Sequence, residues 1–187
     1  MTELELTVEQ FDPSSHTAMQ AAATAARSLG HGFIGTEHLL LGAAEADETV
    51  SAALARHFDF PDAYKQKLLE LLRRHPEWRR HVPRREALAA VGVDLDAVQQ
   101  QAASDFGADA QVQDDHGPPF TPRAADALRA AATAARAHDR QASAADIAVA
   151  ALGDHDGYAA VTARELGADP AVVAGSIEVA APGPHEH

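Results

Sequence analysis

Apolar residues recur along this chain three or four positions apart, which is the spacing of one face of an α-helix. The first such stretch predicts a helix that begins at Pro13, because proline is favoured in the first turn. The same pattern predicts further helices from near Thr36, over residues 49–57 and over residues 61–73. Long alternating runs of β-branched and aromatic residues do not occur, so a sheet has little support. The apolar face of the first predicted helix carries Met19, Ala22, Ala26 and Leu29.

An internal repeat organises these helices. The heptapeptide AAATAAR occupies residues 21–27 and occurs again at residues 130–136, an offset of 109 positions. Because one offset holds over a long stretch, the chain is predicted to contain two copies of a four-helix unit. Each copy is too small to bury much apolar surface by itself, so the two are expected to pack together. The same offset aligns Phe11 with Phe120, Pro13 with Pro122, and Pro61 with Pro170.

The predicted organisation is a single all-α module over residues 1–187, in which two pseudo-symmetric four-helix repeats flank a partly helical insert. The insert opens with an arginine cluster, Arg73–Arg85, and continues with apolar residues at helical spacing between Val91 and Phe106. The parts are a first repeat at 11–73, the insert at 74–119, a second and degenerate repeat at 120–177, and a flexible tail at 178–187.

Six arginines surround one tryptophan in the cluster Arg73–Arg85. Clustered arginine with an aromatic residue can contact phosphates and stack on bases, so nucleic-acid binding is one interpretation. A linker that forms internal ion pairs is the simpler interpretation, because the chain as a whole carries a formal net charge of -13. That charge repels nucleic acids and anionic membranes. It favours either cationic partners or solubility, and solubility is the simpler explanation of the net charge.

Composition places the chain among ordinary globular proteins, with 46% hydrophobic and 23% charged residues. Alanine is abundant, and because it has the highest helix propensity and a small side chain, many short and tightly packed helices are expected. Cysteine is absent, and no apolar run approaches the roughly 18 residues of a membrane-spanning helix. The N-terminus lacks the basic and apolar regions of a signal peptide, so a cytoplasmic location without a membrane partner is expected.

Catalytic motifs find no support in the sequence. The lysines are Lys65 and Lys67, and neither follows a glycine, so the GxxxxGK[ST] phosphate loop of an ATPase cannot form. The GxSxG motif of serine hydrolases does not occur. His31 and His38 lack the HExxH spacing of a zinc site and have no identifiable third ligand, so they are expected to be turn and packing residues. The chain is therefore expected to be no enzyme and to need neither cofactor nor metal.

Residues 29–54 read LGHGFIGTEHLLLGAAEADETVSAAL, in which an LGH turn and an IGTEH motif precede a leucine-rich helix. This segment resembles the repeat found in the N-terminal domains of Clp-type ATPases. PFTPRA at residues 119–124 resembles the start of the second repeat in that family. The resemblance covers both repeats and implies an eight-helix, pseudo-twofold module without the ATPase itself. Such domains recruit substrates and adaptors to a Clp unfoldase.

The resemblance is to ClpC-like members, in which the glutamate of each GTEH motif is implicated in binding phosphoarginine, a degradation tag on protein substrates. It implies a ligand-binding site formed by Thr36, Glu37 and His38. The second copy reads SAADI where the first reads IGTEH. Asp146 therefore keeps only the charge of the glutamate and is the weaker candidate.

Helix capping offers another explanation of the same residues. Thr36 can cap the helix that it begins, and Glu37 in the first turn is favoured by the helix dipole whatever it binds. Ser143 and Asp146 have the spacing of a capping box, in which each side chain accepts from the other residue's amide. The sequence leaves both explanations open for Glu37 and favours capping for Asp146.

The function that the resemblance implies is a non-catalytic protein- or peptide-binding module, acting as an adaptor or decoy in the regulation of Clp-dependent proteolysis. Its expected partners are arginine-phosphorylated substrates, cyclic-peptide antibiotics that target Clp unfoldases, or a Clp unfoldase or protease complex. Two alternatives stay open. One is a helical interaction protein whose peptide site has decayed, and the other is weak nucleic-acid binding through the arginine-rich insert.

Overall fold

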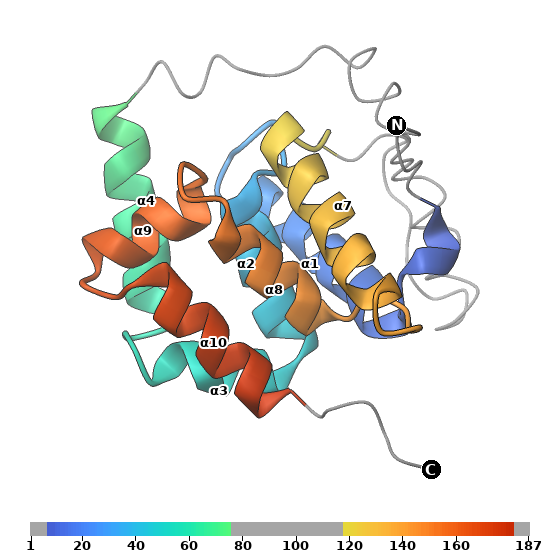
Figure 1. The fold of residues 1–187 in the computed structure, drawn as a ribbon. Helices are drawn as coiled ribbons and strands as arrows, with labels where there is room; N and C mark the ends of the chain where they lie inside the picture. The colour runs from blue at the N-terminus through green and yellow to red at the C-terminus, as the bar shows by residue number, and fades with distance from the viewer. Residues whose placement is uncertain (1–6, 76–117, 182–187) are drawn as a thin grey trace.

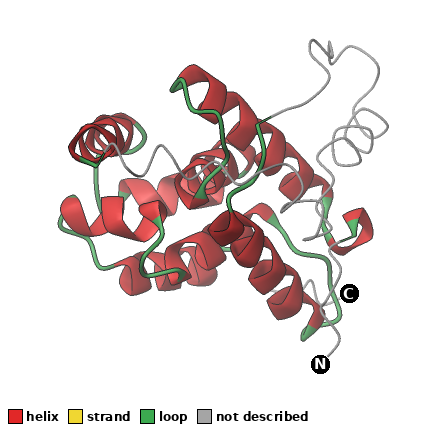
Figure 2. Ribbon diagram, turned by 90° about the horizontal axis from the view of Figure 1, so that it is seen from above, coloured by secondary structure: helices red, strands yellow, loops and turns green. Residues whose placement is uncertain are grey.

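The computed structural model describes residues 7–75 and 118–181, and within these two ranges the regular elements are helices (Figure 1). The expectation of an all-α fold is confirmed. Figure 2 shows these helices joined by loops when the molecule is seen from above. The first half contains η1 (Val8–Gln10), α1 (Pro13–Ser28), α2 (Thr36–Ala46), α3 (Glu48–Ala55) and α4 (Asp62–Arg74). The second half contains α7 (Pro122–Arg136), α8 (Ala144–Gly153), α9 (Tyr158–Glu165) and α10 (Pro170–Ala180).

The two halves run through four helices in the same order, and the corresponding helices begin 108 to 110 residues apart. α2 and α8 pack against each other at the centre of the molecule, α1 packs on α2, and α7 packs on α8 (Figure 1). α10 lies across α8 and α3 and so connects the second half with the first. The arrangement follows the order of the proposed repeats, and the duplication of one ancestral unit stays a prediction.

Two isolated parallel β-bridges join the halves crosswise, one between Phe11 and Ala142 and the other between Ile34 and Phe120. In the first bridge, the Asp12 amide donates to the Ala142 carbonyl oxygen at 2.9 Å. In the second, the Thr121 amide donates to the Ile34 carbonyl oxygen at 2.8 Å. Each half thus supplies the segment before its first helix to the other half, which places the beginning of α7 beside the beginning of α2.

Prolines and capping side chains start the first helix of each half where the sequence predicts it. Asp12 accepts from the Ser15 amide at 2.9 Å, and Pro13 follows it as the first helical residue. Thr121 accepts from the Ala124 amide at 3.2 Å before Pro122. α3 and α4 lie within two residues of their predicted limits. α10 runs to Ala180, three residues beyond the predicted end of the second repeat, because the Ala181 amide still donates to the Ile177 carbonyl oxygen.

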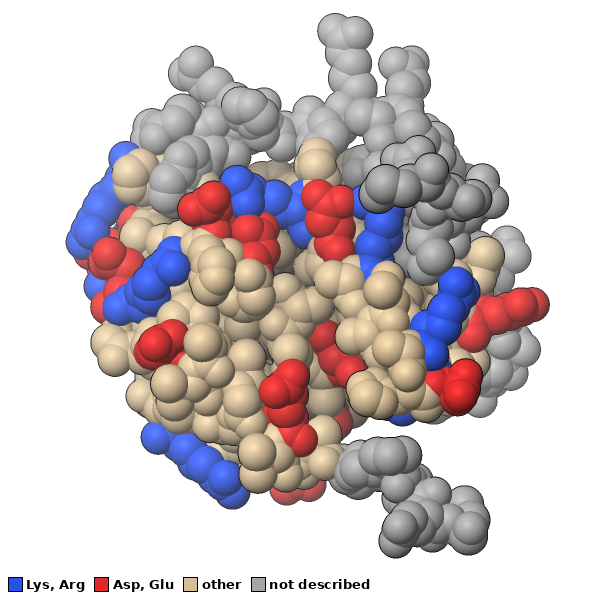
Figure 3. All heavy atoms as spheres, in the orientation of Figure 1, with Lys and Arg blue, Asp and Glu red and all other residues tan. Residues whose placement is uncertain are grey.

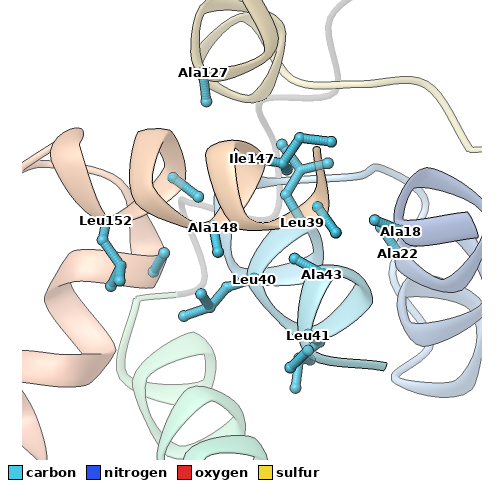
Figure 4. Close-up of a cluster of buried hydrophobic side chains, with 14 of the residues drawn as sticks. Ala18, Ala22, Leu39, Leu40, Leu41, Ala43, Ala127, Ile147, Ala148 and Leu152 are labelled. Carbon is cyan, nitrogen blue, oxygen red and sulfur yellow. The ribbon is translucent and has the colours of Figure 1, made fainter. Parts of the chain in front are cut away.

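The core lies between α2 and α8, where leucine and isoleucine side chains meet alanines of the neighbouring helices (Figure 4). At Gly42 of α2, an added Cβ atom would lie 2.1 Å from the carbonyl oxygen of Ala18 in α1. Glycine is therefore required here, because the backbones of the two helices are in contact. The labelled core residues are Ala18, Ala22, Leu39, Leu40, Leu41, Ala43, Ala127, Ile147, Ala148 and Leu152.

Several sequence predictions concern residues that the structure does not describe. They are the helix between Val91 and Phe106, the arginine cluster beyond Arg74, and the last residues of the tail. Arg74 itself forms an ion pair with Glu70 at the end of α4. None of the described helices combines the length and hydrophobicity that crossing a membrane requires.

Candidate functional site

The GTEH motif forms the N-terminus of α2, which begins at Thr36 after Gly35 as the N-cap. Gly35 has no side chain to cap the helix, and the Gly35 amide instead donates to Nδ1 of His38 at 2.9 Å. The sequence suggested that the Thr36 hydroxyl caps its own helix, but the structure shows no such hydrogen bond. The hydroxyl instead accepts from the Ala159 amide at 3.3 Å and so satisfies the first turn of α9 in the other half. Gly157 permits this approach, because a Cβ atom there would lie 2.8 Å from the Thr36 hydroxyl oxygen.

The Glu37 side chain is completely buried and folds back over Gly35. A Cβ atom at position 35 would lie 2.2 Å from Oε2 of Glu37, so the carboxylate occupies space that only glycine leaves free. Nδ1 of His38 lies 3.2 Å from Oε1 of Glu37, and neither carboxylate oxygen has a partner with good hydrogen-bond geometry among the described residues. Burial raises the pKa of Glu37 from 4.5 to about 7, and its own backbone amide partly opposes this increase. At neutral pH the carboxyl group is therefore close to half protonated.

Two buried hydroxyl groups lie near the Glu37 carboxylate or near each other. Tyr64 of α4 interacts electrostatically with Glu37, and Thr162 of α9 interacts with Tyr64, although neither hydroxyl has a partner with good hydrogen-bond geometry among the described residues. Burial raises the pKa of Tyr64 well above its ordinary value, and the nearby Glu37 carboxylate raises it further. Glu37 thus stands where α2, α4 and α9 meet, in a part of the core with several polar groups that are incompletely paired.

His31 and His38 form a hydrogen-bonded chain behind Glu37. Because Nδ1 of His38 accepts from the Gly35 amide, the proton of this neutral ring is placed on Nε2. Nε2 then donates to Nδ1 of His31 over 2.7 Å. Burial, together with His31, lowers the pKa of His38 to about 3, so the ring is neutral at physiological pH. His31 also stacks on Phe33, with ring centroids 5.6 Å apart.

The fold supplies the third candidate metal ligand that the sequence did not reveal. His31, Glu37 and His38 each offer a ligand atom within 4.8 Å of the others. However, Nδ1 of His38 already accepts from the Gly35 amide, and the hydrogen bond from Nε2 requires that this nitrogen carry the proton. A metal ion on either nitrogen would break one of these hydrogen bonds. The arrangement favours a hydrogen-bonded network over a metal centre.

A pocket of about 380 Å³ opens beside Glu37 at the junction of the two halves. Thr36 and Glu37 lie in its wall, whereas His38 lies behind them and Asp146 belongs to a different surface. The second half contributes the beginnings of α7 and α9. These contributions were not found from the sequence because they depend on the crosswise packing. The lining consists of Phe33, Gly35, Thr36, Glu37, Thr121, Pro122, Arg123, Asp156 and Tyr158.

Asp146 has a full set of partners, in contrast to Glu37. The predicted capping box is confirmed, since Oδ2 accepts from the Ser143 amide at 2.8 Å and the Ser143 hydroxyl accepts from the Asp146 amide at 3.3 Å. The two terminal nitrogens of Arg140 donate to Oδ2 at 2.5 Å and to Oδ1 at 2.8 Å. Burial alone would raise the pKa of Asp146, but the hydrogen bonds from Arg140 and Ser143 outweigh it and hold the pKa below its usual value.

We expect Asp146→Ala to lower the free energy of unfolding by about 1–2 kcal/mol, because both the helix cap and the arginine pair are lost. Arg140→Ala should have a smaller effect, since it leaves the capping box intact. Urea denaturation followed by circular dichroism measures both values. An equal loss in the two variants would show that the cap contributes nothing.

The sequence and the fold of this chain both resemble those of known proteins. Residues 10–83 match the family model of the Clp repeat (R) N-terminal domain. The crystal structure of the N-terminal domain of the caseinolytic protease associated chaperone ClpD from Arabidopsis thaliana superposes with a TM-score of 0.52. The match has 19% sequence identity and covers 94% of this chain and 97% of that chain. No curated protein matches the sequence. Residues 10–83 thus match the Clp repeat N-terminal domain family, and the chain has the fold of a Clp N-terminal domain.

Proposed function

We propose that this chain is a non-catalytic protein-interaction module that binds arginine or phosphoarginine side chains of other proteins in the pocket beside Glu37. The family match supports protein interaction in general. The observation that carries the finer proposal is the Glu37 carboxylate, which lies in a pocket wall with no hydrogen-bond partner among the described residues. A buried carboxylate without a cationic partner is costly to the folded protein. Glu37 is completely buried beside the pocket, so the proposal requires that its side chain turn toward the arriving cation, which would then offset that cost.

The pocket lining suits a phosphorylated guanidinium group. The paired oxygens of Glu37 match the parallel N–H groups of a guanidinium. The aromatic residues Phe33 and Tyr158 belong to the lining, and an aromatic ring can attract a planar cation. Arg123 is about half exposed and can turn toward a phosphate, although it now donates to Asp154 at 2.7 Å. The volume of about 380 Å³ is sufficient for one long side chain.

Replacing Glu37 by alanine is expected to weaken phosphoarginine binding by about 10- to 100-fold, which corresponds to the loss of charge-assisted hydrogen bonds worth about 1.5–3 kcal/mol. Isothermal titration of free phosphoarginine into the parent and the variant measures this change. Asp146→Ala is the matched control and should change the affinity little, because Asp146 already holds Arg140. Two equal sites on the parent, or no binding at all, would contradict the proposal.

The proposed cellular role is that of an adaptor or decoy in Clp-dependent proteolysis, with a Clp unfoldase or a cyclic peptide that targets it as further candidate partners. An interaction protein with a decayed peptide site is the second candidate. It is favoured by the second half, where Arg140 of the chain itself occupies the carboxylate at the start of α8. Retention of the parent from a native lysate on immobilised phosphoarginine, and its loss in Glu37→Ala, distinguishes the two.

A further inference from the structure

A second concave surface lies between α7 and α8, far larger than the pocket at Glu37. This groove encloses about 1220 Å³ on the face of the molecule that Figure 3 shows. One wall is a stripe of small side chains on α7 at the spacing of successive helical turns, and the facing wall includes Val149 of α8. The stripe consists of Ala127, Ala130, Ala131 and Ala134. Such walls are apolar but nearly flat, so they let another backbone come close.

The rim of the groove is acidic. Six carboxylates and two arginines belong to its lining, and both arginines are already neutralised, Arg123 by Asp154 and Arg140 by Asp146. Figure 3 shows both acidic and basic side chains on this face, so the acidic character concerns the lining of the groove. Among the described residues, no ion pair involves the rim carboxylates Asp47 and Glu178. The groove therefore presents an uncompensated negative charge around an apolar floor.

We propose that this groove docks one amphipathic helix of a partner protein, with small or branched apolar residues on one face and lysine or arginine on both flanks. The alanine stripe at spacings of three and four residues complements the ridges of such a helix, and the acidic rim complements its flanks. The Arg140–Asp146 pair shows that a carboxylate of this rim accepts a guanidinium group through two hydrogen bonds. A second copy of this chain is disfavoured as the occupant, because both copies would carry a formal net charge of -13.

A synthetic peptide tests the proposal without knowledge of the natural partner. The probe is a fluorescent amphipathic peptide of alanine, leucine and lysine, long enough for about four helical turns. Fluorescence anisotropy should show saturable binding to the parent that weakens as NaCl is raised. A permuted peptide of the same composition, which cannot form an apolar face, should bind at least about 10-fold more weakly, and the same peptide with glutamate in place of lysine should not bind.

Two pairs of variants locate the site. Ala130→Trp fills the groove from an exposed position, and its matched control is Ala171→Trp at an exposed position of α10 outside the groove. Glu178→Lys reverses a rim charge, and its matched control is Glu165→Lys at the end of α9. Each groove variant should weaken binding by about 10-fold, as expected for a well-placed interface residue, while each control stays within about twofold of the parent.

Three results would overturn the proposal. They are tight binding of the permuted peptide, unchanged binding to Ala130→Trp, and a dimer of the parent that Ala130→Trp dissociates, since the last would make a second copy the occupant. Circular dichroism of each variant shows whether it is folded. Phosphoarginine titration of Ala130→Trp separates this proposal from that for Glu37, because Ala130 lines the groove and not the pocket, so only peptide binding should change.

Discussion

Replacing Glu37 by glutamine is expected to raise the free energy of unfolding by about 3 kcal/mol at pH 8 and to change it little at pH 4. Burial raises the pKa of Glu37 from 4.5 in a solvated chain to about 7 in the folded protein. Between these values the folded protein retains a proton that the unfolded chain releases. Stability from the neutral carboxyl group is therefore fully present below pH 4.5 and is lost as the pH rises through 7, by about 1.4 kcal/mol for each pH unit.

His38 changes the stability in the opposite direction, so the parent alone does not reveal either effect. Burial lowers the pKa of His38 from 6.5 to about 3, and its stabilising contribution is present above pH 6.5 and lost as the pH falls through 3. Between pH 4.5 and 6.5 the two contributions oppose each other. In Glu37→Gln, the free energy of unfolding should therefore rise with pH across this window, because only His38 still titrates.

Urea denaturation of the parent and the variant at a series of pH values between 4 and 8 measures these differences. His38→Asn is the matched variant, because asparagine keeps an acceptor for the Gly35 amide but does not titrate. With Glu37 alone titrating, its stability should fall as the pH rises. A difference between parent and Glu37→Gln that stays constant with pH would show that Glu37 is ionised normally in the folded protein.

Gly42→Ala is expected to lower the free energy of unfolding by about 3 kcal/mol, although alanine is the better helix former by about 1 kcal/mol. The added Cβ atom would lie 2.1 Å from the carbonyl oxygen of Ala18 and 2.6 Å from the amide nitrogen of Ala22. Both are backbone atoms of α1, so no side chain can rotate away. The collision is relieved only when α1 and α2 separate, and this separation opens the core.

Gly175→Ala provides the control of opposite sign. Gly175 lies in α10, and a Cβ atom there would meet nothing within 4 Å. The substitution should therefore stabilise the protein by about 0.5–1 kcal/mol through the unfolded chain and the helix propensity. Thermal unfolding followed by circular dichroism compares the two. A Gly42→Ala variant that is more stable than the parent would show that α1 and α2 can accommodate the added methyl group.

The features predicted correctly from the sequence depend on residues that are close together along the chain. Pro13 and Pro122 predicted the starts of α1 and α7, and the capping box predicted for Ser143 and Asp146 is present. Each depends on residues within three positions of one another. Thr36 and Glu37 of the GTEH motif both line the pocket, whereas His38, the next residue on the helix, does not.

The features that sequence reasoning missed depend on contacts between the halves. The Thr36 hydroxyl caps α9, whose Ala159 lies 123 positions further along the chain. The burial of Glu37 and the contribution of Arg123 and Tyr158 to its pocket follow from the packing of α7 and α9. A periodic pattern says that a helix has a buried face, but it does not say which helix covers it.

The first two helices of each half pack differently. Gly42 lets the backbones of α1 and α2 come into contact, so no space is left between these two helices at this position. The residue 109 positions later is Ala151, which is also completely buried, and it is between α7 and α8 that the groove opens. A substitution at Gly42 would push the backbones of α1 and α2 apart. A substitution at the exposed Ala130 would change only the surface of the groove, so the two pairs of helices differ in how freely their residues can be exchanged.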